Sequence, residues 1–332
     1  MFGFVAAVLG FFALLVIAYL RGPRVRVVDR VEEPQLPALS ALEAWIAARE
    51  AAVPALHSGC EKRIRWAGAP AVRTPLALLY VHGFSATRRE ISPVVERLAE
   101  RRAANAYFAR LRGHGRDEEA FGSATVNDWL HDTLEAYRIA QRLGERVVLI
   151  GTSTGACLAL WLAMRNEPGI AALVLISPNF GPRDRRAEFM LGPWGVWLAR
   201  QVTGGYREVP VKSEEHARVW QTRQPAKAVV EMMALVDYVR RMDLERIWQP
   251  TLVLYSPHDG TVDPRKMLAH VERLGSESKR LVDMTAPPRP QPGHPHVLAG
   301  DILSPQTTQS AVDEMDAFLR SALHLHAPAA PE

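Results

Sequence analysis

The chain has 332 residues, of which 48% are hydrophobic and 23% are charged. This balance is typical of a globular protein and excludes a disordered chain, and the length allows one large domain or two modest ones. The formal net charge is only +4, and no basic stripe carries interleaved aromatic residues, which argues against nucleic acid as a partner. The two cysteines, Cys60 and Cys157, lack the spacing of zinc ligands. Since Cys157 falls in a predicted buried helix, we expect no disulfide between them.

The chain begins with an apolar segment. Residues 2–20 contain no charged side chain, and their number suits one crossing of a bilayer. No Lys or Arg precedes them and Tyr19-Leu20-Arg21 is a poor cleavage site, so we expect an uncleaved transmembrane anchor over residues 1–20 rather than a signal peptide. The arginines from Arg21 to Arg30 place the large domain in the cytoplasm by the positive-inside rule. The sequence thus predicts a single-pass protein of the cell membrane.

After a Pro-containing linker (21–37) and a helix (38–56), short apolar runs alternate with helical patterns. Most runs are too apolar to be half-exposed strands and suit a parallel sheet covered on both faces. This alternation predicts an α/β fold with a doubly wound, mostly parallel sheet. The predicted strands are 76–81, 106–111, 146–151, 172–177, 251–256 and 278–284, and the predicted helices between and after them are 91–102, 126–143, 154–166 and 310–323.

One long gap, between residues 177 and 251, interrupts this rhythm. A structureless loop of that length would be unusual, and the gap carries two helical apolar patterns, so we expect a small helical cap over one end of the sheet. Trp194, Trp197, Met232 and Met233 in this cap are candidates for the lining of a ligand pocket, although core packing is the more frequent role of such residues. The predicted divisions are an anchor (1–20), a linker and helix (21–60), a core in two parts (61–182 and 247–325), the cap (183–246) and a disordered tail (326–332).

The most informative motif is Gly151-Thr152-Ser153-Thr154-Gly155. It follows a buried strand and opens an apolar helix, which is the context that the G-x-S-x-G motif of a nucleophilic serine requires. The glycines let strand and helix approach closely while the serine takes a strained backbone conformation. Ser153 is therefore the predicted nucleophile, at the N-terminus of a helix.

A serine hydroxyl needs a base, and the base needs an acid that orients it. In this fold the acid follows a late strand and the histidine follows the last one. Asp259 comes three residues after the strand 251–256 and is favoured over Asp263, which precedes Pro264 and is expected to cap a helix. His296 leads into an apolar stretch and is favoured over His294.

Two backbone N–H groups usually bind the oxyanion of acyl transfer. One belongs to the residue after the nucleophile, which is Thr154. The other is expected in the loop after an early strand, where His82-Gly83 makes the N–H of Phe84 the candidate. We expect His82 to hydrogen-bond this loop and not to serve as the base.

These residues occur together with other recognisable segments, and the set resembles the serine carboxylesterase and monoacylglycerol-lipase branch of the α/β-hydrolase superfamily. The matching segments are 82–85 with Glu90 following, 111–115, Asp128-Trp129, 151–155, 259–264 and 296–298. They span most of the chain beyond the first 75 residues.

The resemblance implies hydrolysis of a small-molecule or lipid ester through an acyl-enzyme, with no metal or organic cofactor. It carries the nucleophile onto Ser153, the acid onto Asp259, the base onto His296, and the oxyanion donors onto Phe84 and Thr154. Two alternatives stay open, because fold and triad do not fix the bond that is cleaved. One is hydrolysis of a thioester, amide or carbon–carbon bond, and the other is a non-catalytic binding protein that keeps the fold.

Overall fold

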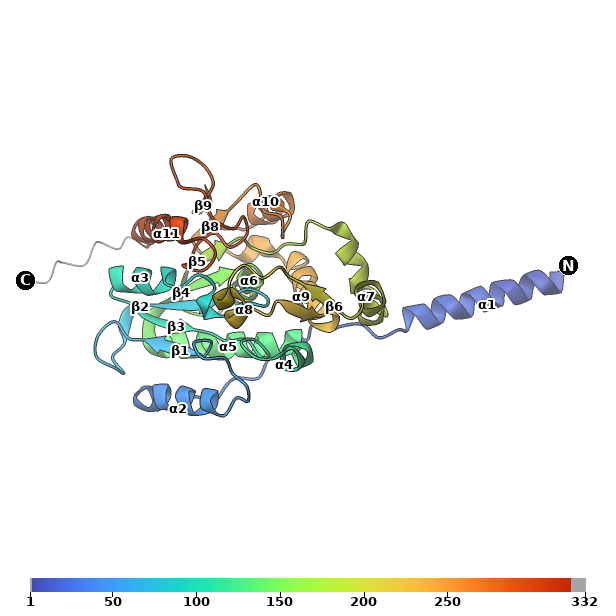
Figure 1. Ribbon diagram of the computed structural model, residues 1–332, viewed down its shortest axis with the longest axis horizontal. Helices are drawn as coiled ribbons and strands as arrows, with labels where there is room; N and C mark the ends of the chain where they lie inside the picture. The colour runs from blue at the N-terminus through green and yellow to red at the C-terminus, as the bar shows by residue number, and fades with distance from the viewer. Residues whose placement is uncertain (1, 324–332) are drawn as a thin grey trace, which may run out of the picture.

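The structure, a computed structural model, describes residues 2–323 (Figure 1). The predicted disordered tail, residues 326–332, lies outside the described residues. At the centre is a seven-stranded sheet in which every neighbouring pair is parallel except β1 with β3, which confirms the predicted mostly parallel sheet. In their order across the sheet the strands are β1 (Arg63–Arg65), β3 (Asn105–Phe108), β2 (Thr74–Val81), β4 (Gly144–Thr152), β5 (Ile170–Ile176), β8 (Thr251–Tyr255) and β9 (Lys279–Asp283).

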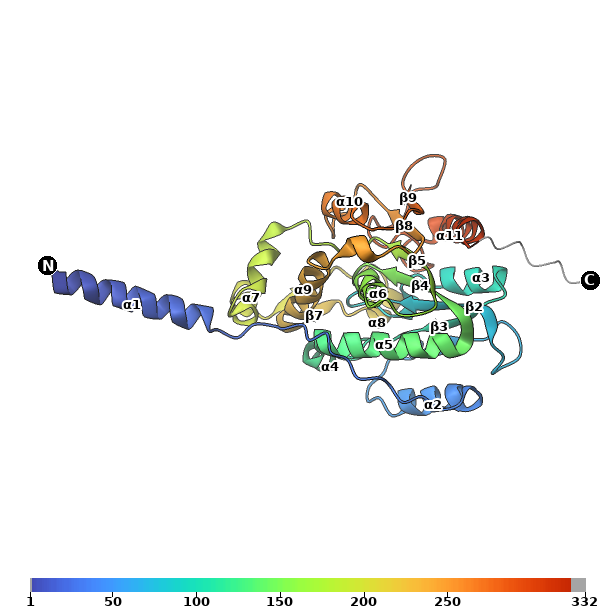
Figure 2. The same ribbon diagram turned by 180° about the vertical axis from the view of Figure 1, so that it is seen from behind.

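Helices cover both faces of this sheet, as Figures 1 and 2 show from opposite sides. Successive side chains of a strand point to opposite faces. Accordingly, Leu78 and Tyr80 of β2 pack into one hydrophobic cluster, whereas Leu79 and Val81 pack into the other. The first cluster includes α3 (Val94–Arg101) and α11 (Thr308–Ala322), and the second includes α5 (Val126–Leu143), α6 (Thr154–Met164) and α10 (Pro264–Glu272).

Helices α5 and α6 both pack against the sheet, but they are stabilised in different ways. α5 starts with a capping box: Thr125 Oγ1 accepts the N–H of Asp128 at 3.2 Å, and Asp128 Oδ2 accepts the N–H of Thr125 at 2.9 Å. α6 is apolar around its circumference and buried along nearly its whole length, packed against the sheet, α5 and α9. Such a helix is held by burial on every side rather than by an amphipathic pattern.

The segment between β5 and β8 forms a cap with its own small two-stranded sheet. Its residues fold partly as the sequence predicts, with helices at both apolar patterns. The cap consists of a 3₁₀ helix (Arg185–Leu191), α7 (Gly195–Thr203), β6 (Tyr206–Glu208), α8 (Glu214–Val219), β7 (Arg223–Pro225) and α9 (Ala226–Arg240). A further short helix of the core, α4 (Glu118–Ser123), lies beside β7 and α9.

An early helix, α2 (Leu39–Ala51), is fixed to the core by a buried ion pair. Leu42 and Ile46 enter the hydrophobic core, and the guanidinium of Arg110 donates to both carboxylate oxygens of Glu50, at 2.7 and 2.8 Å. Both side chains are less than a tenth exposed. Burial by itself raises the pKa of Glu50, but the hydrogen bonds and charge of Arg110 outweigh it and hold that pKa below its ordinary value.

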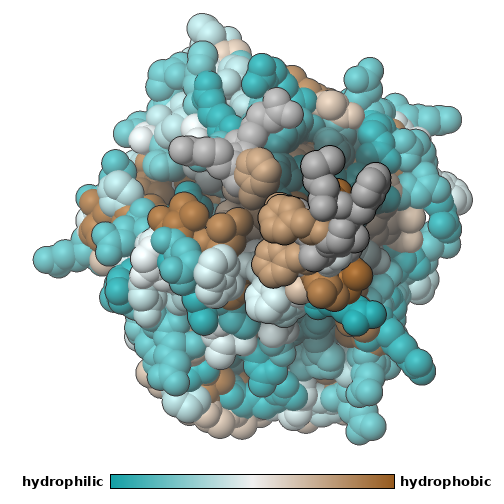
Figure 3. Space-filling model, turned by 90° about the vertical axis from the view of Figure 1, so that its right-hand side faces the viewer, coloured by the Kyte–Doolittle hydropathy of each residue, from teal (hydrophilic) through white to brown (hydrophobic). Residues whose placement is uncertain are grey.

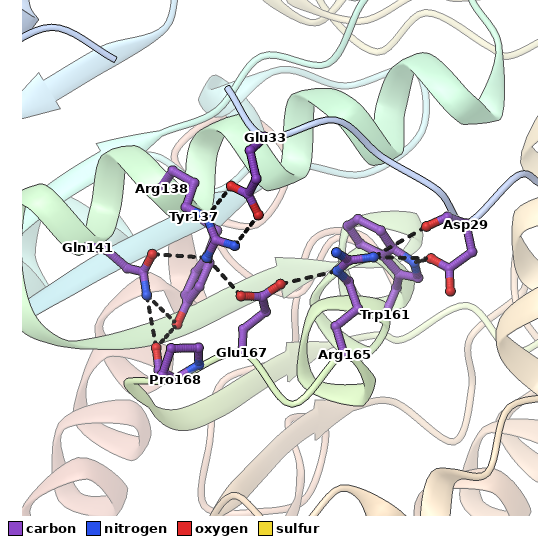
Figure 4. A network of polar contacts seen from close by, with 9 residues as sticks. All are labelled: Asp29, Glu33, Tyr137, Arg138, Gln141, Trp161, Arg165, Glu167 and Pro168. Atoms are coloured by element: carbon purple, nitrogen blue, oxygen red, sulfur yellow. Dashed lines mark hydrogen bonds and ion pairs between the residues drawn. The ribbon is translucent and has the colours of Figure 1, made fainter. Parts of the chain in front are cut away.

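Residues 22–36 are extended and lie along the outer helices rather than hanging free. Asp29 accepts the indole N–H of Trp161 at 2.5 Å, and Glu33 accepts two hydrogen bonds from the guanidinium of Arg138 at 2.6 and 2.7 Å. Glu167 bridges Arg138 to Arg165, so the contacts form one network across α5 and the end of α6 (Figure 4). The predicted linker is thus a docked segment, which we call the N-terminal strap.

The N-terminal end of the strap contacts the cap. Pro23 O accepts the N–H of Trp194 at 2.7 Å. A Cβ at Gly22 would lie 2.1 Å from Trp194 Nε1, so a larger residue there must displace this ring. Trp194 itself has a left-handed backbone with φ of 63° at the start of α7. The strap therefore joins the cap to the outer helices of the core.

Ahead of the strap, α1 (Phe2–Leu20) projects from the end of the molecule near α7 (Figure 1). Apolar side chains gather at this end (Figure 3), among them the exposed Phe4, Phe11, Trp197 and Val202.

Within the described part of the chain, no helix combines the length and the apolar character that a membrane crossing requires. The predicted transmembrane anchor over residues 1–20 is therefore wrong. The membrane localisation, the membrane as a partner and the cytoplasmic placement of the catalytic domain were inferred from that anchor, and they fall with it.

The Arg110–Glu50 pair gives a prediction for stability. Glu50→Ala leaves a buried guanidinium without its carboxylate, so we expect the free energy of unfolding to fall by about 3–5 kcal/mol in urea titrations. Glu43→Ala is the matched control, because Glu43 accepts the indole N–H of Trp66 at an exposed site and its loss should cost less than about 1 kcal/mol. Equal losses in the two variants would contradict the prediction.

Candidate active site

Ser153 occupies the turn between β4 and α6, with φ of 53° and ψ of −112°. This is a strained conformation for a residue with a side chain. The surrounding backbone holds it: the N–H of Ser153 donates to Ile176 O at 2.8 Å, and its carbonyl accepts the N–H of Asn179 at 3.2 Å. The serine is thus fixed at the C-terminal edge of the sheet and at the N-terminus of a helix.

The second glycine of the motif explains how the turn is possible. A Cβ at Gly155 would lie 2.1 Å from Val81 O and 2.6 Å from His82 O, both backbone atoms. A Cβ at Gly151 would meet the backbone of Gly155 at 2.5 Å. Helix α6 therefore approaches the ends of β2 and β4 to a distance that only glycine permits, as the sequence predicts.

The predicted acid and base lie together. His296 Nδ1 and Asp259 Oδ2 are 2.7 Å apart, and Asp259 is only 2% exposed. Asp259 Oδ1 also accepts the backbone N–H groups of Thr261 at 2.7 Å and Val262 at 3.1 Å. A carboxylate held in this way accepts a proton-bearing Nδ1 and leaves Nε2 of the imidazole free to act as a base. His296 and Ser153 line one cavity of about 370 Å³.

The two competing residues have other partners. His294 Nδ1 accepts the N–H groups of His296 and Val297, each at 3.2 Å. Burial and the nearby His296 lower the pKa of His294 to about 4, so the ring is neutral at pH 7 and acts as an acceptor that shapes the loop. Asp263 caps α10 by accepting the N–H of Arg265 at 3.0 Å. The geometry thus pairs Asp259 with His296, which are the residues that the sequence favours.

The two predicted oxyanion donors border the same cavity. Thr154 is the first residue of α6, where backbone N–H groups lack a helical acceptor. Phe84 follows β2, and its ring packs against Phe121 with the ring centroids 5.0 Å apart. His82 supports this loop by accepting the N–H of Leu111 at Nε2, at 3.1 Å. Burial lowers the pKa of His82 to about 4, which keeps the ring neutral and suits the structural role expected from the sequence.

Glu90 is a residue of this site to which the sequence assigns no role. Its carboxylate Oε2 accepts the N–H of Gly83 at 2.8 Å and the hydroxyl of Tyr80 at 2.9 Å, beneath the loop that carries Phe84. The side chain is 3% exposed and borders the cavity of Ser153. Burial raises its pKa even though both hydrogen bonds and the charge of His296 oppose the shift. The sequence signal for Glu90 was that it follows His82-Gly83 in one of the segments that resemble the family.

A second, larger cavity of about 740 Å³ adjoins the first beneath the cap. Its walls are mainly apolar and include Met190, Leu198 and Val229, and it shares Met232 and Asn179 with the cavity of Ser153. Of the four cap residues suggested by the sequence, Met232 borders both cavities. Met233 is buried in the core, and Trp194 and Trp197 border neither of these cavities.

Within residues 2–323, no three His, Cys, Asp or Glu side chains come together so as to hold a metal ion. Cys60 and Cys157 are both buried and unpaired with each other, as expected. Cys157 lies one turn into α6 and donates to Asn179 O. It behaves as a small residue of the core, and burial raises the pKa of its thiol to about 12.

The close approach at Gly155 gives a second prediction for stability. Gly155→Ala must displace the carbonyl groups of Val81 and His82, so we expect the free energy of unfolding to fall by about 1–3 kcal/mol or more. Gly68→Ala is the control, because a Cβ there meets nothing within 4 Å. Urea titrations of the two variants would contradict the prediction if Gly155→Ala were as stable as Gly68→Ala.

Comparisons with known proteins identify the family of this chain. The family model Hydrolase_4, described as serine aminopeptidase, S33, matches residues 74–285, which is more than half of the chain. A thermostable monoacylglycerol lipase of Bacillus sp. (strain H-257) is 25% identical over 217 residues, covering 63% of this chain and 80% of the relative.

Solved structures show the same fold. One comes from work on LipS and LipT, two metagenome-derived lipolytic enzymes. It superposes with a TM-score of 0.64 at 19% identity, covering 80% of this chain and 99% of that one. The monoacylglycerol lipase of Paleococcus ferrophilus superposes with a TM-score of 0.57 at 17% identity, covering 77% and 98%. With a matching family model, a matching fold and the strand–Ser153–helix turn, the chain belongs to the Hydrolase_4 family of α/β-hydrolases and is a carboxylic ester hydrolase of the monoacylglycerol-lipase-like branch.

Proposed function

We propose that this enzyme cleaves monoacyl esters through an acyl-enzyme formed on Ser153. The observation that carries the proposal is the Asp259–His296 contact of 2.7 Å at the wall of the cavity that also contains Ser153. The relatives named above as monoacylglycerol lipases support an ester with one acyl chain.

In the proposed reaction His296 Nε2 takes the proton of Ser153 Oγ as the oxygen attacks the ester carbonyl carbon. The N–H groups of Phe84 and Thr154 hold the oxyanion, and Asp259 stabilises the imidazolium. His296 then gives its proton to the departing alcohol. A water molecule, deprotonated by His296, hydrolyses the acyl-enzyme and restores the serine.

The apolar cavity supports a place for the acyl chain. It adjoins the cavity of Ser153 through Met232 and Asn179, and Met190, Leu198 and Val229 line it. Burying an acyl chain against such walls contributes roughly 0.8 kcal/mol for each CH₂ group. We therefore expect esters of medium or long chains to be better substrates than acetates.

The family description names an aminopeptidase, but the cavity favours an ester over a peptide with a free amino terminus. An aminopeptidase must hold an ammonium group, which a carboxylate does best. Of the two acids at the cavity of Ser153, Glu90 is buried with a raised pKa, and Glu208 is directed to Arg223. The cavity is also bordered by the cations Arg207 and Lys212. These charges repel an ammonium group at the site.

The role of Ser153 is tested by Ser153→Ala. We expect kcat for aryl esters of graded acyl length to fall by more than about 10⁴-fold, with an unchanged unfolding curve, and labelling by a fluorophosphonate probe to disappear. The exposed Ser58→Ala is the control. If the parent protein is folded yet inert to every ester, amide and thioester tried and to the probe, the non-catalytic alternative replaces the proposal.

The role of Glu90 is tested by a pair of substitutions. Glu90→Ala removes the acceptor of the Gly83 N–H and the Tyr80 hydroxyl, so the loop that carries Phe84 loses its support and kcat should fall by about 10- to 100-fold, since removing an oxyanion donor outright costs about 10²–10³. Glu90→Gln keeps an oxygen where both bonds converge and should retain most of the activity. Equal losses in kcat would show that the carboxylate acts in another way.

A further inference from the structure

Two cations of the cap border the cavity of Ser153 without an acidic partner. Arg207, on β6, lines both this cavity and the apolar one, and Lys212 lines the cavity of Ser153. Across residues 2–323, neither side chain takes part in an ion pair or donates a hydrogen bond to another residue. A charged group beside a cavity without a protein partner is available to a ligand.

The neighbouring arginines of the cap differ in this respect. Arg223 on the paired strand contacts Glu118 at 2.6 Å, and Arg240 contacts Glu188 at 2.7 Å. Glu208, next to Arg207 in sequence, is directed to Arg223 at 3.8 Å and is largely exposed. Arg207 is exposed on β6, and no acidic group acts on its pKa. Arg207 and Lys212 therefore differ from Arg223 and Arg240 in having no carboxylate partner among the described residues.

The wall of the Ser153 cavity carries two cations, Arg207 and Lys212, and two acids, Glu90 and Glu208. Burial, followed by the charge of Lys212, lowers the pKa of His216, which disfavours the charged form of this ring. Glu90 is an acid in the wall, but its pKa is raised and its Oε2 is occupied by Gly83 and Tyr80. Since Glu208 is directed to Arg223, the two cap cations remain available to a ligand in the space beside Ser153.

We propose that the alcohol portion of the substrate carries an anionic group, a phosphate or a carboxylate, which Arg207 and Lys212 bind. This inference rests on the proposed function and specifies its substrate. The acyl chain fits the apolar cavity, so the alcohol lies on the other side of Ser153, where Lys212 borders the cavity. Arg207 stands at the junction of the two cavities, with its apolar stem available to the chain and its guanidinium to the anion.

The test compares three esters that share a lauroyl chain: lauroylglycerol, lauroylglycerol phosphate and the lauroyl ester of glycerate. For the parent enzyme we expect kcat/KM to be at least about tenfold higher for one or both anionic esters than for the neutral one, which equals about 1.4 kcal/mol. The phosphate and glycerate arms show which anion is bound. The preference should shrink at 0.5 M salt, because screening weakens an ionic contact at an open cavity.

Amino-acid substitutions distinguish anion binding by Arg207 and Lys212 from a general loss of activity. Arg207→Met and Lys212→Met should each lower the ratio of anionic to neutral kcat/KM by about fivefold or more, and Arg207→Lys should restore part of it. Arg200→Met removes a charge from α7 at a residue that borders neither cavity and should leave the ratio unchanged. A parent enzyme that hydrolyses lauroylglycerol at least as well as both anionic esters overturns the inference while leaving the proposed function intact.

A binding measurement keeps the inference testable without turnover. Calorimetry on Ser153→Ala should show lauroylglycerol phosphate or lauroylglycerate binding at least fivefold more tightly than lauroylglycerol, and Arg207→Met in that background should abolish the difference. Equal affinities for all three esters overturn the inference even if the parent enzyme is inert. Loss of labelling by a serine-reactive probe, in contrast, bears on the proposed function alone.

Discussion

The approach of α6 to the end of β2 is the constraint on which the rest of the site depends. With no room for a Cβ at Gly155, the helix begins directly against the strand ends, and Ser153 is forced into a strained turn. That placement puts the first N–H of α6 beside the loop after β2. The remaining parts of the site, His296 with its partner Asp259 and the support from Glu90, lie at the cavity that Ser153 also borders.

The sequence predicts those parts of the fold whose local residue pattern is strong. The buried parallel strands have continuous apolar runs, and α5 has the predicted bounds, Val126–Leu143, because a capping box fixes its start. Sequence alone does not predict strands β1, β6 and β7, since strands of three residues are too short to show a period. The roles of Arg207 and Lys212 also escape prediction, because an unpaired cation is recognised only when its neighbours are known.

The predicted membrane anchor shows the limit of composition as a guide. Hydrophobic residues in the first 20 positions suggested a bilayer crossing, yet the described part of the chain contains no helix that qualifies for one. For the predicted linker, in contrast, the sequence underestimated how ordered the segment is. A proline-containing stretch without periodicity is ordered here because its charged side chains meet Arg138 and Trp161 on the outer helices.

The N-terminal strap also determines where the chain can be truncated without removing contacts of the folded domain. The first packed helix, α2, begins at Leu39, and a boundary drawn there would discard the only acceptors that the indole of Trp161 and the N–H of Trp194 have within the described chain. One of these groups belongs to the core and the other to the cap. The folding unit of the hydrolase therefore starts near Gly22, and the strap is an integral edge of the domain.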